Sequence, residues 1–251
     1  MYGEFSTVYD RLMRDVDYDR WASYLCGLLT DNGVLPGGTL FECCCGTGQI
    51  TVRLASYGFR MTASDSSGDM LMIARERCRE AGRRVSFVCQ DMRSISVHKP
   101  VDAVIACCDG VNYLIGTSDL VSFLSAASHS LRADGLLLFD ISSEYKIVNV
   151  LGMNTFGEDE EDICYFWRNM YDEKSRLAEL SLSCFVRQKE GSYRRIREKQ
   201  LQRAYSVSEI TDAAAAAFFE PLGIYGFGSV SRPTECDERI QFVFRKKAVC
   251  V

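Results

Sequence analysis

The stretch Glu42-Cys43-Cys44-Cys45-Gly46-Thr47-Gly48 decides the fold of this chain. It follows an apolar run that begins at Thr39 and leads into a segment with helical spacing, so it joins a buried strand to a helix. An acidic strand end followed by small residues and two glycines makes a tight turn, where a ligand can approach bare backbone. Thr51 stands where a dinucleotide fingerprint needs its third glycine. We therefore predict a loop for a nucleotide-type cofactor other than NAD.

The segments after this loop alternate between short apolar strands and amphipathic helices. We expect strands at 60–65, 85–91, 101–109 and 136–142, and helices at 48–58, 68–82 and 118–131. Short apolar strands separated by helices form a parallel sheet with both faces covered. The sequence thus predicts an α/β fold with a doubly wound, mostly parallel sheet.

The pattern changes after Ser143. Between 163 and 205 apolar and polar residues alternate, and a Glu190-Gly191-Ser192 turn joins two long runs. This alternation predicts an inserted antiparallel hairpin or meander. The acidic run 157–162 is typical of a solvated loop.

The C-terminal part returns to helical spacing. We expect a helix that begins at Ser206 or Ser208 and is stopped by Pro221-Leu222-Gly223, followed by two closing strands. The whole chain is expected to form one domain. Two parts are added to its core: a helical cap at 1–35, and the insert at 144–205, which we expect to be a lid or a substrate wall.

The composition is that of a cytoplasmic globular protein. Of 251 residues 47% are hydrophobic, yet no apolar run approaches the roughly 20 residues of a membrane span, and the N-terminus has no signal-peptide pattern. A net charge of -5 disfavours a nucleic-acid partner. The 12 cysteines contain no C-x-x-C pair, and His98 and His129 are the only histidines, so we expect no metal site. His129 falls within an amphipathic helix, where we expect a structural role.

Further polar residues stand where consecutive strands end. Asp65 follows the second strand, Asp91 and Met92 the third, and Cys107 to Asp109 the fourth. Open parallel sheets bind ligands at the carboxyl ends of their strands. A carboxylate at 65 can accept ribose hydroxyls, and Asp91 beside a thioether suits an exocyclic amine on a flat base.

These motifs resemble a known family. E-x-C-x-G-T-G, Asp65, the QDM triplet at 90–92 and CCDGVNYL at 107–114 look like motifs I, post-I, II and IV of class I S-adenosylmethionine-dependent methyltransferases. The opening VYDRLMRDVDYDRWASYL and the inserted hairpin are similar to a YqeM-like bacterial group. The resemblance implies a seven-stranded sheet with one antiparallel edge strand, S-adenosylmethionine as cofactor and S-adenosylhomocysteine as product.

The resemblance also implies roles for single residues. Glu42 would order the loop and contact the methionine end, Gly46 and Gly48 would leave room, and Asp65 would hold the ribose. The expected cofactor-binding set is Tyr9, Trp21, Glu42, Cys44, Gly46, Gly48, Asp65, Ser66, Met70, Asp91, Met92 and Cys107. Cys44 departs from the glycine or alanine of the commoner motif, and we expect it to have a negative φ. For Tyr9 and Trp21, aromatic packing of the leading helix is an equal alternative.

Methyl transfer from a sulfonium needs a well-placed, uncharged nucleophile and little else. We expect the polar groups at the mouth of the site to be Tyr9, Asp109, Asn112 and Tyr113. The predicted acceptor is the nitrogen or oxygen of a small molecule. Two alternatives stay open: methylation of RNA or protein, and a non-catalytic module that binds S-adenosylmethionine or S-adenosylhomocysteine. The insert could also serve as the surface of a homo-oligomer.

Overall fold

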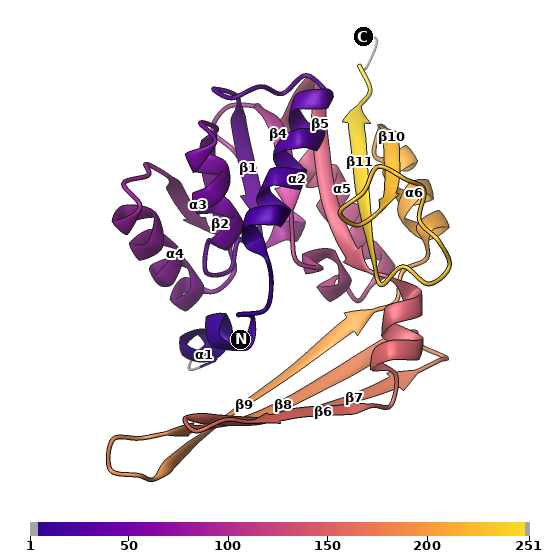
Figure 1. Cartoon of the computed structure of the whole chain (residues 1–251). Helices are drawn as coiled ribbons and strands as arrows, with labels where there is room; N and C mark the ends of the chain where they lie inside the picture. Colours follow the sequence, from indigo (N-terminus) through magenta and orange to yellow (C-terminus); the bar gives the residue numbers. More distant parts are fainter. Residues whose placement is uncertain (1–4, 249–251) are drawn as a thin grey trace.

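The computed structural model describes residues 5–248 and contains two sheets. A seven-stranded sheet with helices on both faces forms the core, and a long four-stranded sheet lies beside the ends of its strands (Figure 1). The core strands are β1 (Thr39–Cys43), β2 (Arg60–Asp65), β3 (Ser86–Cys89), β4 (Val101–Ala106), β5 (Leu131–Ser142), β10 (Phe219–Gly226) and β11 (Arg239–Lys246). Among the described residues, no helix has the length and apolar character needed to cross a membrane.

The core sheet has the strand order β10-β11-β5-β4-β1-β2-β3. The five neighbouring strands β5, β4, β1, β2 and β3 pair in parallel, which confirms the doubly wound sheet. β11 is antiparallel to both of its neighbours, β5 and β10. The sheet thus has one antiparallel strand, as expected, but that strand is not at the edge. The final hairpin inserts β11 between β5 and β10 and leaves β10 as the edge strand.

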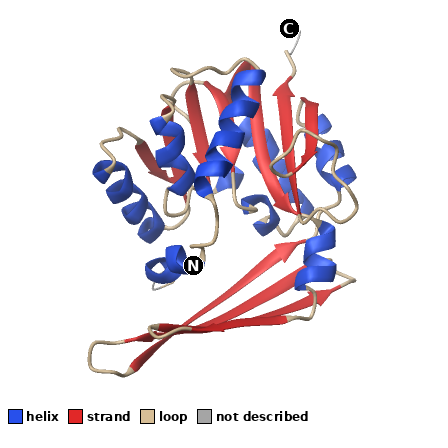
Figure 2. Ribbon diagram, in the orientation of Figure 1, coloured by secondary structure: helices blue, strands red, loops and turns tan. Residues whose placement is uncertain are grey.

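Two helical layers cover this sheet, as Figure 2 shows. The helices are α2 (Tyr18–Asp31), α3 (Gln49–Ser56), α4 (Gly68–Glu80), α5 (Thr117–Ser130) and α6 (Val207–Ala216). Successive β5 side chains point to opposite layers: Leu137 and Phe139 pack with α5 and α6, whereas Leu136 and Leu138 pack with α2 and α3. All four are buried, which explains why this strand reads as a continuous apolar run.

The insert forms an antiparallel sheet in the order β6-β7-β8-β9. Its strands are β6 (Thr155–Asp159), β7 (Ile163–Asp172), β8 (Leu177–Arg187) and β9 (Tyr193–Arg203). The expected hairpin or meander is thus a meander with one more strand. Reading all of 157–162 as a loop was wrong, because its first half belongs to β6 and pairs with β7. The acidic side chains of this edge are satisfied by cations, since Glu158 and Glu160 pair with Arg14.

The helix after the insert ends earlier than its proline suggested. α6 ends at Ala216, and Phe218 adopts a left-handed φ of 66° that turns the chain into β10. Pro221 lies inside β10, which is an edge strand where a missing N–H is tolerated. The prediction that Pro221-Leu222-Gly223 stops the helix was therefore wrong.

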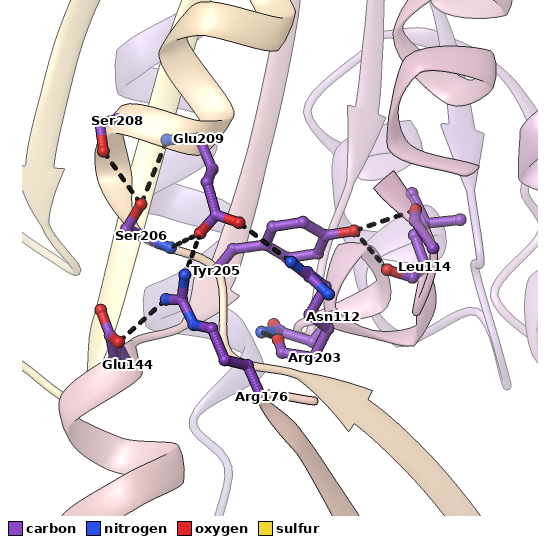
Figure 3. Close-up of polar contacts among 10 residues, drawn as sticks. Asn112, Leu114, Glu144, Arg176, Arg203, Tyr205, Ser206, Ser208 and Glu209 are labelled. Atoms are coloured by element: carbon purple, nitrogen blue, oxygen red, sulfur yellow. Dashed lines mark hydrogen bonds and ion pairs between the residues drawn. The ribbon is translucent and has the colours of Figure 1, made fainter. Parts of the chain in front are cut away.

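The return from the insert to the core is fastened by Glu209 (Figure 3). Its carboxylate accepts from the Ser206 amide at 2.9 Å and completes a capping box at the start of α6. It also pairs with Arg176 at 2.8 Å and with Arg203 at 3.1 Å, and both arginines come from the insert. Although burial opposes ionisation, the hydrogen bonds from Ser206 and Arg203 hold the pKa of Glu209 below its ordinary value. One side chain therefore caps the helix and anchors the sheet.

We predict that Glu209→Ala lowers the free energy of unfolding by about 1–3 kcal/mol at neutral pH, because both the cap and two charge-assisted hydrogen bonds are lost. Glu220→Ala, at an exposed glutamate, is the matched control and should change stability little. Since the folded pKa is lowered, the advantage of Glu209 should vanish as pH falls through that pKa. Urea titrations of both variants test this, and equal losses would contradict it.

Candidate functional site

The loop after β1 turns through left-handed backbone at three residues. φ is +52° at Cys44, +53° at Gly46 and +77° at Gly48. The expected negative φ of Cys44 is therefore wrong. Gly110 accommodates the unusual side chain, because a Cβ on Gly110 would lie 3.2 Å from the Cβ of Cys44. The turn thus needs the left-handed conformation, and a neighbouring glycine makes space for a cysteine that adopts it.

The two glycines of this loop have different roles. Apart from Gly46 itself and its two chain neighbours, no atom of residues 5–248 lies within 4 Å of the place where a Cβ on Gly46 would stand, so the backbone is open to a ligand. A Cβ on Gly48 would instead lie 2.9 Å from the Cβ of Ala74. Gly46 therefore leaves open space beside its backbone, whereas Gly48 lets α3 begin close against α4.

Glu42 is a buried residue just before the end of β1. Its side chain is 2% exposed and accepts a hydrogen bond from the Thr51 hydroxyl at 2.5 Å. Burial, assisted by the nearby Asp65 carboxylate, raises the pKa of Glu42 to about 8. The carboxyl therefore titrates near neutral pH, and a cation beside it would favour its ionised form.

Asp65 links the loop to the next helix. Its two carboxylate oxygens accept from the backbone amides of Gly46 and Ser67, each at 2.9 Å. Each oxygen keeps a lone pair for a further donor. Of the predicted residues that follow it, Ser66 is exposed beside this carboxylate, whereas Met70 is buried in the first turns of α4.

The ends of β3 and β4 complete this side of the site. Asp91 accepts from the Arg93 amide at 2.8 Å and pairs with its guanidinium, which lowers the pKa of Asp91. Buried Met92 places its sulfur 3.4 Å from the Cys44 sulfur, so the third strand end contacts the loop after β1. Cys107 is buried where β4 ends. The structure thus brings the strand-end residues to one edge, as the sequence predicted.

The residues after Cys107 are held by a buried carboxylate. Cys108 and Asp109 have left-handed φ values of 58° and 52°, and their amides donate to the two oxygens of Asp140, each at 2.9 Å. Arg239 pairs with Asp140 and, at 2.8 Å, with Asp109. Gln202 from the insert donates to the other oxygen of Asp109 at 2.8 Å. Asp109 is therefore fixed in one orientation.

Sequence reasoning missed Asp140, Arg239 and Gln202. Asp140 had one signal, a single acid inside the apolar run LLLFDIS. An acid there is unlike its buried neighbours and requires a partner. The partner comes 99 residues later in the chain, and nothing local in the sequence identifies it.

A cavity of about 320 Å³ lies between these strand ends and the insert. It is lined by Phe5, Tyr9, Leu12, Met13, Val16, Cys108, Asp109, Tyr113, Ser142, Lys146, Leu151, Tyr165, Trp167, Leu180, Leu182, Glu198, Gln200, Gln202 and Arg239. Three of the four residues expected at the mouth, Tyr9, Asp109 and Tyr113, are among them. The Tyr113 hydroxyl donates to Gln200 at 2.7 Å and so joins the core to the cavity floor.

The N-terminal helix α1 (Ser6–Leu12) closes one side of the cavity. Asp10 accepts from the Thr47 hydroxyl at 2.7 Å and from the Gln49 amide at 3.2 Å, and it also pairs with Arg77. These bonds fasten α1 to the loop after β1, a contact that the sequence did not reveal. Burial raises the pKa of neighbouring Tyr9 well above its ordinary value, so its hydroxyl stays a donor.

Two predicted residues lie away from the cavity lining. Asn112 is fully buried, and its amide donates to the carbonyls of Ser142 and Arg203 and accepts from the Ser142 amide. Trp21 is 6% exposed and packs against Phe227 with Arg239 4.9 Å from its ring centroid. Asn112 thus forms hydrogen bonds to the backbone, and Trp21 packs against Phe227 and Arg239; aromatic packing was the alternative that was open for Trp21. His129 lies on α5 with Nδ1 2.7 Å from the Ser125 carbonyl oxygen.

We predict that Glu42→Gln removes a pH-dependent loss of stability. The native state keeps the Glu42 proton up to pH about 8, whereas the unfolded chain releases it near about 4.3, so rising pH between these values destabilises the native state. In urea titrations at about pH 5, 7 and 9, the free energy of unfolding of the variant should rise relative to that of the natural protein as pH increases. A difference between the two proteins that does not change with pH would contradict the prediction.

The chain resembles known methyltransferases along its whole length. A methyltransferase-domain family model matches residues 41–135. YqeM of Bacillus subtilis (strain 168), which is named as a methyltransferase, is 32% identical over 254 residues, covering 100% of this chain and 99% of its own. The solved structure of an S-adenosylmethionine-dependent methyltransferase from Clostridium acetobutylicum ATCC 824 has a TM-score of 0.89 at 30% identity, over 98% of this chain and 99% of that one.

A more distant structure shares the fold. S-adenosylmethionine-bound CalS10, an amino pentose methyltransferase from Micromonospora echinaspora, has a TM-score of 0.75 at 20% identity, over 96% of this chain and 97% of its own. The strand-end site and the full-length relatives lead to one conclusion. The chain belongs to the YqeM-like group of class I S-adenosylmethionine-dependent methyltransferases.

Proposed function

We propose that this enzyme transfers the methyl group of S-adenosylmethionine to a nitrogen or oxygen of a small molecule held in the cavity between the core and the insert. One observation carries the proposal: the cavity is lined by Cys108 and Asp109, which directly follow Cys107 at the end of β4, a residue expected to bind the cofactor. A donor at the strand ends would therefore face an acceptor in the cavity.

The open backbone at Gly46 and the carboxylate of Asp65 fit the cofactor. In this proposal it is held by Glu42, Cys44, Gly46, Gly48, Asp65, Ser66, Met70, Asp91, Met92 and Cys107. Bound there, the sulfonium supplies an electrophilic methyl group. The chain's own contribution is to position the acceptor and to exclude water, for which the apolar cavity walls and α1 are suited. Tyr9 can donate to the acceptor, and Asp109, fixed by Arg239 and Gln202, can accept from it.

The size of the cavity favours a small acceptor over RNA or protein. A space of about 320 Å³ whose floor is the insert has the dimensions of a small-molecule pocket. The amino pentose methyltransferase CalS10, which shares the fold, acts on such a molecule. A cavity beside the donor site also favours an enzyme over a non-catalytic binding module.

Two further parts of the proposal concern the setting of the enzyme. We place it in the cytoplasm, where reduced thiols are the rule, since the cysteines of the described chain are free. The outer face of the insert exposes Phe166 and Met170, which supports a homo-oligomer built through this sheet.

We predict that Asp65→Ala weakens binding of S-adenosylhomocysteine at least about tenfold, because the variant loses the ribose acceptor and the anchor of the Gly46 amide. Calorimetry measures this, and Asp69→Ala, at an exposed acid in the first turn of α4, should bind as the natural protein does. Failure of the natural protein to bind either S-adenosylmethionine or S-adenosylhomocysteine would refute the proposed function.

The binding module and the enzyme are separated by turnover. We expect transfer of labelled methyl groups to a small-molecule fraction of a cell extract and not to its tRNA or protein fractions. Tight cofactor binding without transfer to any fraction would favour the module, and label in the tRNA or protein fraction would overturn the small-molecule acceptor.

A further inference from the structure

Lys146 is a partly buried cation with no carboxylate oxygen of the described chain within hydrogen-bond distance. It begins the short π-helix η3 (Lys146–Leu151) that leads from the core into the insert, and it lines the cavity. Its side chain is 23% exposed, and its amine lies 3.9 Å from the nearest carboxylate oxygen, that of Glu238. The Glu238 side chain is itself 56% exposed, so solvent weakens this pair.

The other cation of the cavity is in a different state. Arg239 is paired with both Asp109 and Asp140, so its charge is already neutralised by carboxylates of the protein. Burial and then the neighbouring Arg239 hold the pKa of Lys146 below its ordinary value, although Asp109, Glu238 and Asp140 oppose this. A buried charge without a close partner costs free energy, and such a cost is typical of a functional group.

The far end of the cavity carries the opposite charge. Among residues 5–248, no hydrogen bond or ion pair is formed by the Glu198 carboxylate, which lies on the inward face of β9. β9 register places it beside Leu182, which in turn pairs with Trp167. Glu198 is four residues from Gln202, the contact of Asp109, so the strand separates the two positions by about 13 Å.

The cavity floor is therefore divided along its length. The β9 side chains that line the cavity, Glu198, Gln200 and Gln202, form a polar row, whereas the lining residues of β7 and β8 are aromatic or aliphatic. A ligand that matches this floor has one apolar face and one polar edge. The protein presents it with a cation, Lys146, at one end of the cavity and with a carboxylate, Glu198, at the other.

We propose that Lys146 determines acceptor specificity by binding an anionic group, a carboxylate or a phosphate, on the methyl acceptor. The inference rests on the proposed function, because it assumes that this cavity receives the acceptor. Glu198 repels the same group from the opposite end, so the acceptor enters in one orientation with its apolar face on Trp167. The substrate class is a small, amphipathic acid that carries a nucleophilic nitrogen or oxygen.

The test uses the full chain saturated with S-adenosylhomocysteine and two probes, inorganic phosphate and acetate, at constant ionic strength. We expect one of them to shift the amide resonances of η3, and the preferred anion separates a phosphorylated acceptor from a carboxylic acid. Lys146→Met should weaken this binding about tenfold or more, whereas Lys146→Arg should retain it. Lys199→Met, at a lysine with a 66% exposed side chain on β9, is the matched control and should bind as the natural protein does.

Two results would overturn the proposal: neither anion binds the natural protein, or Lys146→Met binds as tightly as it. S-adenosylhomocysteine affinity, measured on the same samples, reports folding of each variant and keeps failure of this inference distinct from failure of the cofactor assignment. Transfer of a labelled methyl group adds a second readout. Two pairs of acceptors are compared: glucosamine 6-phosphate with glucosamine, and amino acids with their amides. Transfer confined to the anionic members supports the proposal, and equal transfer to the neutral members overturns it.

Discussion

The buried carboxylate of Asp140 is the constraint on which the site depends. It lies on β5, binds the two left-handed amides after β4, and pairs with Arg239 at the start of β11. Burial raises its pKa, and the Arg239 cation opposes that rise. Removing either partner would leave the other charge buried and alone, which costs far more than an exposed pair is worth. The same guanidinium packs over Trp21 of α2, so one ion pair ties three strands to a helical layer.

From this point the geometry of the cavity follows. Because the strand ends are fixed, Asp109 can accept a hydrogen bond from Gln202 on β9 of the insert, and the Tyr113 hydroxyl can donate to Gln200 on the same strand. These two contacts set the inward face of β9 toward the core. The side-chain period of two then decides which residues of the insert line the cavity and which face outward. Register, more than any single contact, determines the composition of the cavity floor.

The sequence was sufficient for the core because burial on both faces leaves a strong pattern. LLLFDIS could only be a covered strand, and acids placed after such strands had to meet at one edge. The failures have local causes. Cys44 was assigned a negative φ because strain at a cysteine is normally avoided, yet Gly110, 66 positions later, removes the clash that matters. Pro221 has the pattern of a helix stop, because the sequence does not distinguish an edge strand, where proline is tolerated, from a central one.

The site divides in the same way. Residues that act through backbone turns or strand ends could be predicted, since a position in the chain carries their role. Asp10, Arg239 and Lys146 could not, because their significance depends on partners in distant elements. Asp10 contacts a loop 37 residues away, and an acid in a short amphipathic helix ordinarily faces solvent.

Helix α1 has a consequence for how the two ligands influence each other. Through Asp10 it holds the loop after β1, and Arg11, together with Arg14 just after the helix, holds the acidic edge of the insert. One short helix therefore contacts both the loop after β1 and the insert. A ligand that orders α1 at one surface lowers the ordering cost at the other, and thermodynamic reciprocity requires the benefit to be mutual. In the proposed enzyme, donor and acceptor would therefore favour each other's binding through this seven-residue helix, in addition to any contact between them.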